Sequence, residues 1–310
     1  MKKAILSAAL LSAAAAVFVS ELYRYTFCRE SSRLLAPLLD KQGHAPDHYA
    51  ARDAAAERLR HTPSEPMEIR SERGELLRGW YYPLGGEGRR VAFLIHGYRS
   101  EHAETAGMYL HYYASRGFDL FCCDHTAHGE SGGRFIGFDV FESADCLRWI
   151  EALRRRCGED VQILLHGFSM GAATVLRMSS RCPKQVRLLA ADCGFADGET
   201  QLRASLGVLY PLMRALHRAV AGCDLRQSDV LPSLRESDQP VLIVHGEADA
   251  TVPFENAKFL FDACPGQKDC LFVPGARHVE SMYRAPKRYA QALDRMIEGA
   301  FCCDRKEEHE

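Results

Sequence analysis

A serine between two glycines is the strongest chemical motif of this chain. Gly167 to Gly171 reads Gly-Phe-Ser-Met-Gly, with the apolar run 161–165 before it and a helix-like run over 172–180 after it. A strand-to-helix turn of this kind, a nucleophile elbow, holds the serine strained and exposed, and its glycines leave room where a Cβ would collide. Because five such residues also occur by chance as a glycine-rich turn, the interpretation depends on the rest of the chain.

A serine hydroxyl becomes a nucleophile when a base takes its proton and an acid orients that base. The buried-strand pattern 240–245 ends in a loop that contains Asp249, the predicted acid. The short apolar run 270–274 is followed by Gly-Ala-Arg-His, and His278 is the predicted base. We therefore predict that Ser169, Asp249 and His278 are catalytic.

An acyl-transfer site also needs hydrogen-bond donors for the oxyanion. The apolar run 91–95 leads into His96-Gly97-Tyr98. We predict that the backbone amides of Tyr98 and Met170 form this oxyanion hole, where the loss of one donor typically costs about a hundredfold or more in rate. His96 itself is predicted to hydrogen-bond within its loop.

Together these motifs resemble the α/β-hydrolase superfamily, and more narrowly its serine-aminopeptidase-like and esterase-like branch. The order serine, acid, histidine is that of the α/β-hydrolases and differs from the chymotrypsin-like and subtilisin-like orders. The resemblance covers most of residues 67–300. Its matching segments are His96 to Tyr98, Asp124 to Ser131, Gly167 to Gly171, His245 to Pro253 and Gly275 to His278.

The resemblance also bears on the competing side chains. Asp192 and Asp197 follow the preceding strand, where some α/β-hydrolases carry the acid. Asp249 is preferred because the spacing from Gly246 to Pro253 resembles the family pattern. The position of His128 implies that this residue shapes its loop.

Strands and helices alternate along the chain, which predicts right-handed crossovers and a mainly parallel sheet. An antiparallel hairpin is expected over 67–71 and 75–82. The fold class is α/β: an α/β-hydrolase fold with a mostly parallel eight-stranded sheet, helices on both faces and a small helical cap that would shape the substrate site. The later strands are expected over 91–96, 118–123, 161–165, 186–192, 241–245 and 270–273. The expected organisation is a hydrophobic signal or anchor segment (1–20), a connecting helical region (21–66), the hydrolase domain (67–303) with its cap at about 195–238, and a charged tail (304–310).

The N-terminus differs from the rest because Lys2 and Lys3 precede an uncharged run, rich in alanine and leucine, over residues 4–19. Sixteen residues are short for a membrane span of roughly 20 but suit the apolar core of a signal peptide. We expect membrane contact through residues 4–19 as an uncleaved anchor, with export after signal cleavage as the alternative.

Composition limits the partners. The 310 residues carry 39 basic and 41 acidic side chains and a formal net charge of −2, so nucleic acid is not an expected partner. The twelve cysteines lie mostly where core residues are expected, without zinc-binding spacing, so we expect buried thiols, no metal and no cofactor. This thiol content favours a reducing compartment. The sequence leaves the oligomeric state open.

The predicted function is that of a serine hydrolase, a carboxylesterase that forms an acyl-enzyme on Ser169 and transfers the acyl group to water. A serine peptidase or aminopeptidase, or a thioesterase, would use the same three residues on a small-molecule ester or peptide substrate. A non-catalytic binding protein on a hydrolase scaffold is the third alternative, although no member of the predicted triad is missing.

Overall fold

The strands of this chain form one twisted sheet. The structure, a computed structural model, describes residues 2–36 and 46–301. The strands are β1 (Glu65–Arg70), β2 (Leu76–Tyr82), β3 (Arg90–Ile95), β4 (Asp119–Cys123), β5 (Gln162–Phe168), β6 (Val186–Asp192), β7 (Val241–Gly246) and β8 (Lys268–Val273). Their spatial order is β1-β2-β4-β3-β5-β6-β7-β8. The β1–β2 and β2–β4 pairs are antiparallel and the other pairs are parallel, which confirms the predicted fold class.

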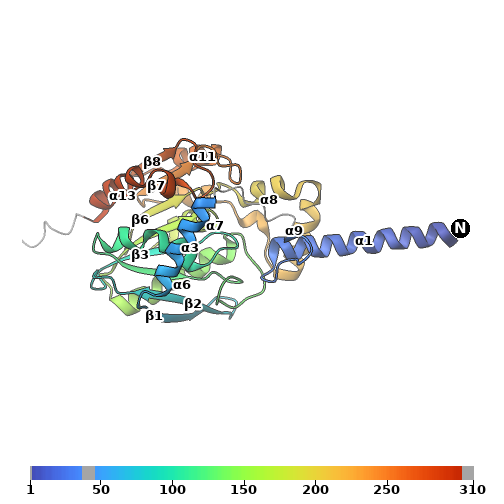
Figure 1. Cartoon of the computed structure of the whole chain (residues 1–310), viewed down its shortest axis with the longest axis horizontal. Coiled ribbons are helices and arrows are strands. Elements are labelled where there is room, and N and C mark those ends of the chain that lie inside the picture. The colour runs from blue at the N-terminus through green and yellow to red at the C-terminus, as the bar shows by residue number, and fades with distance from the viewer. Residues whose placement is uncertain (1, 37–45, 302–310) are drawn as a thin grey trace, which may run out of the picture.

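Helices cover both faces of this sheet (Figure 1). They are α1 (Lys2–Phe27), α3 (Pro46–Arg60), α4 (His102–Ala106), α5 (Leu110–Ala114), α6 (Val140–Cys157), α7 (Met170–Arg177), α8 (Gly198–Leu206), α9 (Tyr210–Ala221), α10 (Leu231–Arg235), α11 (Glu255–Ala263), α12 (Ser281–Arg284) and α13 (Pro286–Phe301). Helices α6, α7 and α11 pack in one apolar cluster, whereas α3, α5 and α13 pack in another.

The pleat of the strands divides these two cores. In β3, Val91, Phe93 and Ile95 belong to the first cluster, and Ala92 and Leu94 belong to the second. Successive side chains of a strand point to opposite faces, so a strand covered on both sides reads as one continuous apolar run. Because β3 and the strands β5 to β8 run parallel, their carboxyl ends meet at one edge, where open α/β sheets bind ligands.

Helix α1 ends inside the domain. The Tyr23 hydroxyl is hydrogen-bonded to Nδ1 of His217 in α9 at 3.1 Å, and the Phe27 ring stacks on the same imidazole with centroids 4.4 Å apart. The Tyr98 hydroxyl donates to the carbonyl oxygens of Tyr25 and Thr26 at 3.1 and 3.0 Å. The last turns of α1 are thereby packed against the loop that follows β3.

The expectation of a membrane or signal anchor at the N-terminus is wrong. Within residues 2–36 and 46–301, no helix combines the length and the apolar character that crossing a bilayer requires. The helix continues beyond the apolar run, through the charged Glu21 and Arg24, to the buried Phe27. The segment therefore forms a helix of mixed polarity whose end joins the core.

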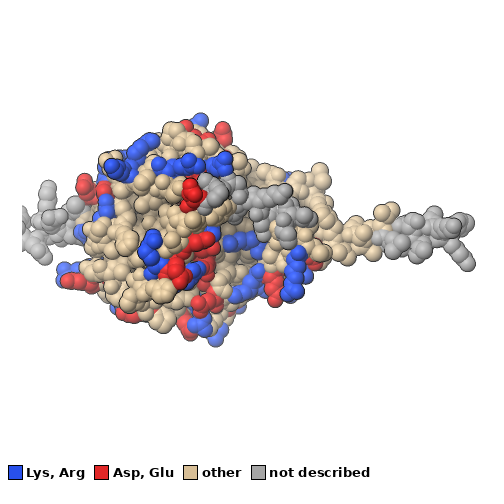
Figure 2. Space-filling model, viewed as in Figure 1, with Lys and Arg blue, Asp and Glu red and all other residues tan. Residues whose placement is uncertain are grey.

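The cap expected between β6 and β7 corresponds to α8, α9 and α10. Tyr210, Met213 and Ala221 of α9 are buried in the first cluster, whereas Leu212 and Val220 are exposed. The ten cysteines of the described residues are free thiols, most of them buried, as expected. The predicted tail over 304–310 and the pair Cys302-Cys303 lie outside the described residues. On the face drawn in Figure 2, basic and acidic side chains are intermixed, in keeping with the small net charge.

Candidate active site

Ser169 lies at the sharp turn between β5 and α7. Its backbone has φ 53° and ψ −116°, a strained conformation for a residue with a side chain. A Cβ on Gly167 would lie 2.2 Å from the carbonyl oxygen of Gly171, and one on Gly171 would lie 2.1 Å from that of Ile95. Both glycines are therefore required by the close approach of the backbone, as the sequence predicts for a nucleophile elbow.

The three residues predicted to act together form one hydrogen-bonded chain. Ser169 Oγ lies 2.8 Å from Nε2 of His278, and Nδ1 of His278 lies 2.7 Å from Oδ2 of Asp249. His278 lies in the loop after β8, and Asp249 lies in the loop after β7. In this arrangement Nδ1–H donates to the carboxylate, which leaves Nε2 free to accept the serine proton.

The Asp249 carboxylate is held on both oxygens. Oδ1 accepts the amides of Thr251 and Val252 at 2.8 and 2.9 Å. Oδ2, bonded to His278, also lies 3.4 Å from Nε2 of the fully buried His245. Burial acts to raise the pKa of Asp249, but the contacts with the two histidines and the backbone outweigh it and hold this pKa well below its usual range. Asp249 is therefore charged near neutral pH.

The two competing carboxylates have other partners. Asp192 accepts the hydroxyl of Tyr289 at 2.9 Å, and burial raises its pKa to about 6. Asp197 caps α8 by accepting the amides of Glu199 and Thr200, both at 3.0 Å. His278 is thus hydrogen-bonded to Asp249 and to neither competitor.

The loop after β3 runs beside the serine. A Cβ on Gly97 would lie 3.2 Å from Cβ of Ser169, which brings the Gly97-Tyr98 backbone close to the nucleophile. His96 Nδ1 lies 2.7 Å from the carbonyl oxygen of Gly97, and its Nε2 accepts the amide of His125 at 3.0 Å. Burial lowers the pKa of His96, so the imidazole is neutral and serves the loop, as predicted.

His128 holds the next residue of the same loop. Its Nε2 accepts the amide of Arg99 at 3.1 Å, and burial lowers the pKa of His128 to about 3. Arg99 in turn donates to the carbonyl oxygen of Cys28 at 3.1 Å, beyond the end of α1. The loop after β3 is therefore fixed from both sides, by the loop after β4 and by the N-terminal helix.

A pocket of about 120 Å³ opens beside Ser169 and His278. Its apolar wall consists of Met108, Tyr109, Phe168, Val279 and Met282. Helix α3 adds His48 and Arg52, and no residue of the cap over 195–238 lines it. Sequence reasoning assigned α3 to a connecting region and the substrate wall to the cap. No local signal placed α3 at the site, because its position depends on long-range packing.

Part of the chain is similar in sequence to a known hydrolase family and to several known proteins. Residues 86–222 match the family model described as serine aminopeptidase, S33. The chain is 24% identical over 199 residues to the uncharacterized protein YqkD of Bacillus subtilis, covering 61% of this chain and 65% of that protein, just under two thirds of its length. It is 25% identical over 236 residues to the alpha/beta hydrolase domain-containing protein 17C of Xenopus tropicalis, covering 75% and 68%.

The solved structures extend the likeness over more of the chain. The esterase Pf2001 of Pyrococcus furiosus superposes with a TM-score of 0.63 at 19% identity, covering 84% of this chain and 95% of that one. The chain therefore has the α/β-hydrolase fold, and part of it is similar to the serine aminopeptidase family. Another α/β structure, Est1E of Butyrivibrio proteoclasticus with ferulic acid bound, gives a TM-score of 0.62 at 17% identity over 76% of this chain and 99% of that one. At these identities the solved structures support the hydrolase fold and leave the substrate to be argued from the site.

Proposed function

We propose that this α/β-hydrolase is a serine carboxylesterase that hydrolyses small acyl esters through an acyl-enzyme on Ser169. The observation that carries the proposal is the continuous hydrogen-bonded chain from Ser169 through His278 to Asp249. It ends at a strained turn beside a pocket, which is where a nucleophile must meet its substrate.

The proposed reaction has two halves. His278 Nε2 takes the Ser169 proton as Oγ attacks the ester carbonyl, and the imidazolium then gives that proton to the departing alcohol. A water molecule, deprotonated by the same nitrogen, attacks the acyl-enzyme and releases the acid. The Asp249 carboxylate stabilises the imidazolium in both halves.

The proposed oxyanion hole consists of the Tyr98 and Met170 amides. Met170 is the first residue of α7, and the first amides of a helix have no partner within the helix. The helix dipole adds partial positive charge at the same end. Gly97 brings the backbone before Tyr98 close to Ser169. In the proposed site these two amides donate to the oxygen on which the negative charge develops.

The pocket supports an ester substrate over an N-terminal amine. Its lining is shared between apolar and polar side chains, and its volume favours a short acyl group. Glu104 is the one carboxylate among the described residues that line it, and this side chain lies 3.5 Å from Arg52 and accepts the Ser100 hydroxyl at 3.0 Å. An aminopeptidase needs a carboxylate available to its substrate ammonium, so an aminopeptidase activity is the weaker candidate.

The test is hydrolysis of p-nitrophenyl esters from acetate to palmitate by the full chain. We expect the highest kcat/KM among the short acyl chains. The variant S169A should lose at least about 10⁴-fold in kcat, because a triad without its nucleophile keeps only binding and oxyanion stabilisation. S205A removes an exposed serine of α8 and is the matched control. Equal activity of S169A and wild type would refute the proposal.

A further inference from the structure

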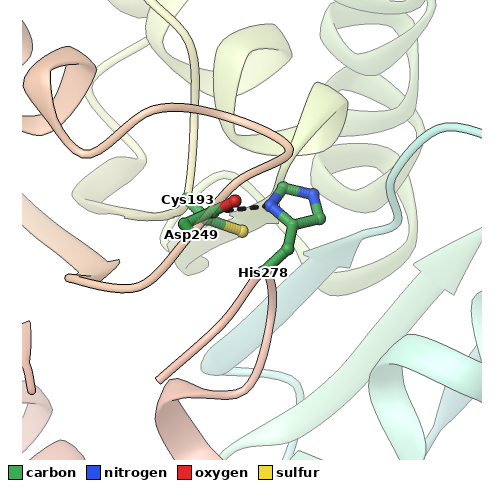
Figure 3. Close-up of side chains that lie close together, drawn as sticks. All are labelled: Cys193, Asp249 and His278. Atoms are coloured by element: carbon green, nitrogen blue, oxygen red, sulfur yellow. Dashed lines mark hydrogen bonds and ion pairs between the residues drawn. The ribbon is translucent and has the colours of Figure 1, made fainter. Parts of the chain in front are cut away.

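A cysteine thiol lies directly behind the proposed acid and base. Cys193 follows the last residue of β6, and its side chain is completely buried. Its Sγ, a carboxylate oxygen of Asp249 and a ring nitrogen of His278 all lie within 4.8 Å of one another. Figure 3 shows the sulfur pointing to the place where the carboxylate meets the imidazole. The proposed ester hydrolysis makes no use of this thiol.

The backbone aims the thiol at this place. Cys193 has φ 49°, a left-handed conformation that residues with a side chain rarely adopt. Its amide donates to the carbonyl oxygen of Val244 in the neighbouring strand β7 at 2.8 Å, so the strained turn is held within the sheet. Such strained positions cluster at functional sites.

Thiolate sulfur, imidazole nitrogen and carboxylate oxygen are the three ligand types that bind Zn²⁺ in proteins. We propose that Cys193, Asp249 and His278 form a binding site for a thiophilic divalent cation of the Zn²⁺ type, and that the bound ion switches the hydrolase off. The inhibition rests on the proposed function, whereas ion binding does not. Oδ1 of Asp249 is held by backbone amides, so Oδ2, which contacts His278, is the oxygen that would bind the ion. Three protein ligands leave the fourth tetrahedral position to water.

Binding would block the triad through the tautomer of His278. In the active arrangement Nδ1 carries the hydrogen and Nε2 accepts the proton of Ser169. An ion that takes the Nδ1 lone pair displaces that hydrogen, and the neutral ring then carries one on Nε2. This N–H donates to Ser169 Oγ, so the base is lost while the serine stays in place.

Ion binding at this site releases one proton in total. The imidazole loses one hydrogen at Nδ1 and gains one at Nε2, so its charge is unchanged. The S–H bond of Cys193 breaks as the metal–sulfur bond forms, and one proton goes to solvent for each ion bound.

The ion can arrive from the substrate pocket. His278 lines that pocket beside Ser169 and is partly exposed, whereas Asp249 and Cys193 lie behind it. An entering ion meets the imidazole first and reaches the sulfur when the ring turns. Substrate and ion therefore use the same opening, and a bound acyl group should slow the onset of inhibition.

The first experiment measures inhibition by Zn²⁺ of the full chain, with each variant normalised to its own rate without metal. Wild type should be inhibited, EDTA should restore it, and C193A should require at least about 100-fold more Zn²⁺, because losing a direct ligand exceeds the 10–100-fold cost of an outer-shell change. C193S tests the same point at nearly constant volume. C270A, which removes a half-buried thiol of β8, is the matched control and should behave as wild type.

The second experiment follows Cd²⁺ binding by its thiolate absorbance, without substrate. S169A and wild type should share a band that C193A and H278A lack. A wild-type protein that shows the Cd²⁺ band but hydrolyses no ester would refute the proposed function and leave the metal site supported. Absence of inhibition in wild type, equal inhibition of C193A and wild type, or the same band in C193A would each overturn the site.

Discussion

The pKa values of two pairs of buried carboxylates in this molecule are shifted in opposite directions. Asp249 and Asp124 follow strands β7 and β4, and their contacts hold both pKa values well below the usual range in spite of burial. Glu142 and Asp145 lie in the first turns of α6, where burial raises both pKa values to about 7. Burial is common to all four, so depth alone does not decide whether a carboxyl group is charged.

The partners make the difference. Asp124 accepts the amides of His102 and Glu130 at 2.9 and 2.7 Å and lies 3.0 Å from the His102 imidazole. Glu142 accepts one amide, that of Gly137 at 2.8 Å, and its second oxygen has no hydrogen-bond partner among the described residues. The first pair suits a lasting negative charge, which a triad acid requires. The surroundings of the second pair favour the protonated, neutral form of each acid in the first turns of α6.

The largest expected effect comes from removing the charge of Asp249. In D249N the amide NH₂ faces Nδ1 of His278 and favours the tautomer that carries hydrogen on Nε2, so kcat should fall about 10³–10⁴-fold. Ester hydrolysis measures this loss, and circular dichroism checks the fold. D197N removes the helix-capping competitor and should stay within about threefold of wild type. A D249N variant with more than a tenth of the wild-type activity would show that the charge of Asp249 is not what distinguishes the first pair.

The variant D124N should act on stability. The asparagine has one side-chain oxygen, so the buried amides of His102 and Glu130 can no longer both be accepted by the side chain. The free energy of unfolding should fall by about 2–4 kcal/mol. Urea unfolding at pH 7 measures the change in free energy. An unchanged midpoint would mean that the charged carboxylate of Asp124 stabilises the fold no more than a neutral amide does.

The smallest change in stability is expected for substitution of Glu142, which should stabilise the protein, whereas D124N should destabilise it. The pKa of Glu142 rises from 4.5 to about 7 on folding, so the native state binds more protons between these values and stability falls as pH rises through them. E142Q removes this dependence and should gain about 1–3 kcal/mol on wild type between pH 5 and pH 8. Urea unfolding at both pH values measures it.

The control for E142Q is E151Q, an exposed carboxylate of the same helix, which should follow wild type at both pH values. For D249N the linkage has the other sign. A pKa lowered on folding contributes stability above the unfolded value and loses it as pH falls, so the deficit of D249N should shrink in acid. Parallel pH curves for E142Q and D249N would show that the two pairs do not differ.

Local sequence patterns predicted a large part of the fold. The sequence placed all eight strands to within a few residues. Continuous apolar runs marked the central strands, because a strand covered on both faces must be apolar throughout, whereas β1, which is largely exposed, was predicted from the hairpin pattern. The elbow at Ser169 was also local, since its glycines are required by backbone contacts inside one turn. The membrane anchor was wrong because the apolar run of α1 says nothing about where Phe27 packs.

The sequence by itself determined which strand each predicted catalytic residue follows: the serine follows β5, the carboxylate follows β7 and the histidine follows β8. Tertiary structure alone decided that α3 lines the pocket, that α1 ends against the loop after β3, and that Cys193 lies beside Asp249 and His278. The physical reason is range. Strand periodicity and turn sterics act between near neighbours in the chain, whereas these contacts join distant segments that only the packed sheet brings together.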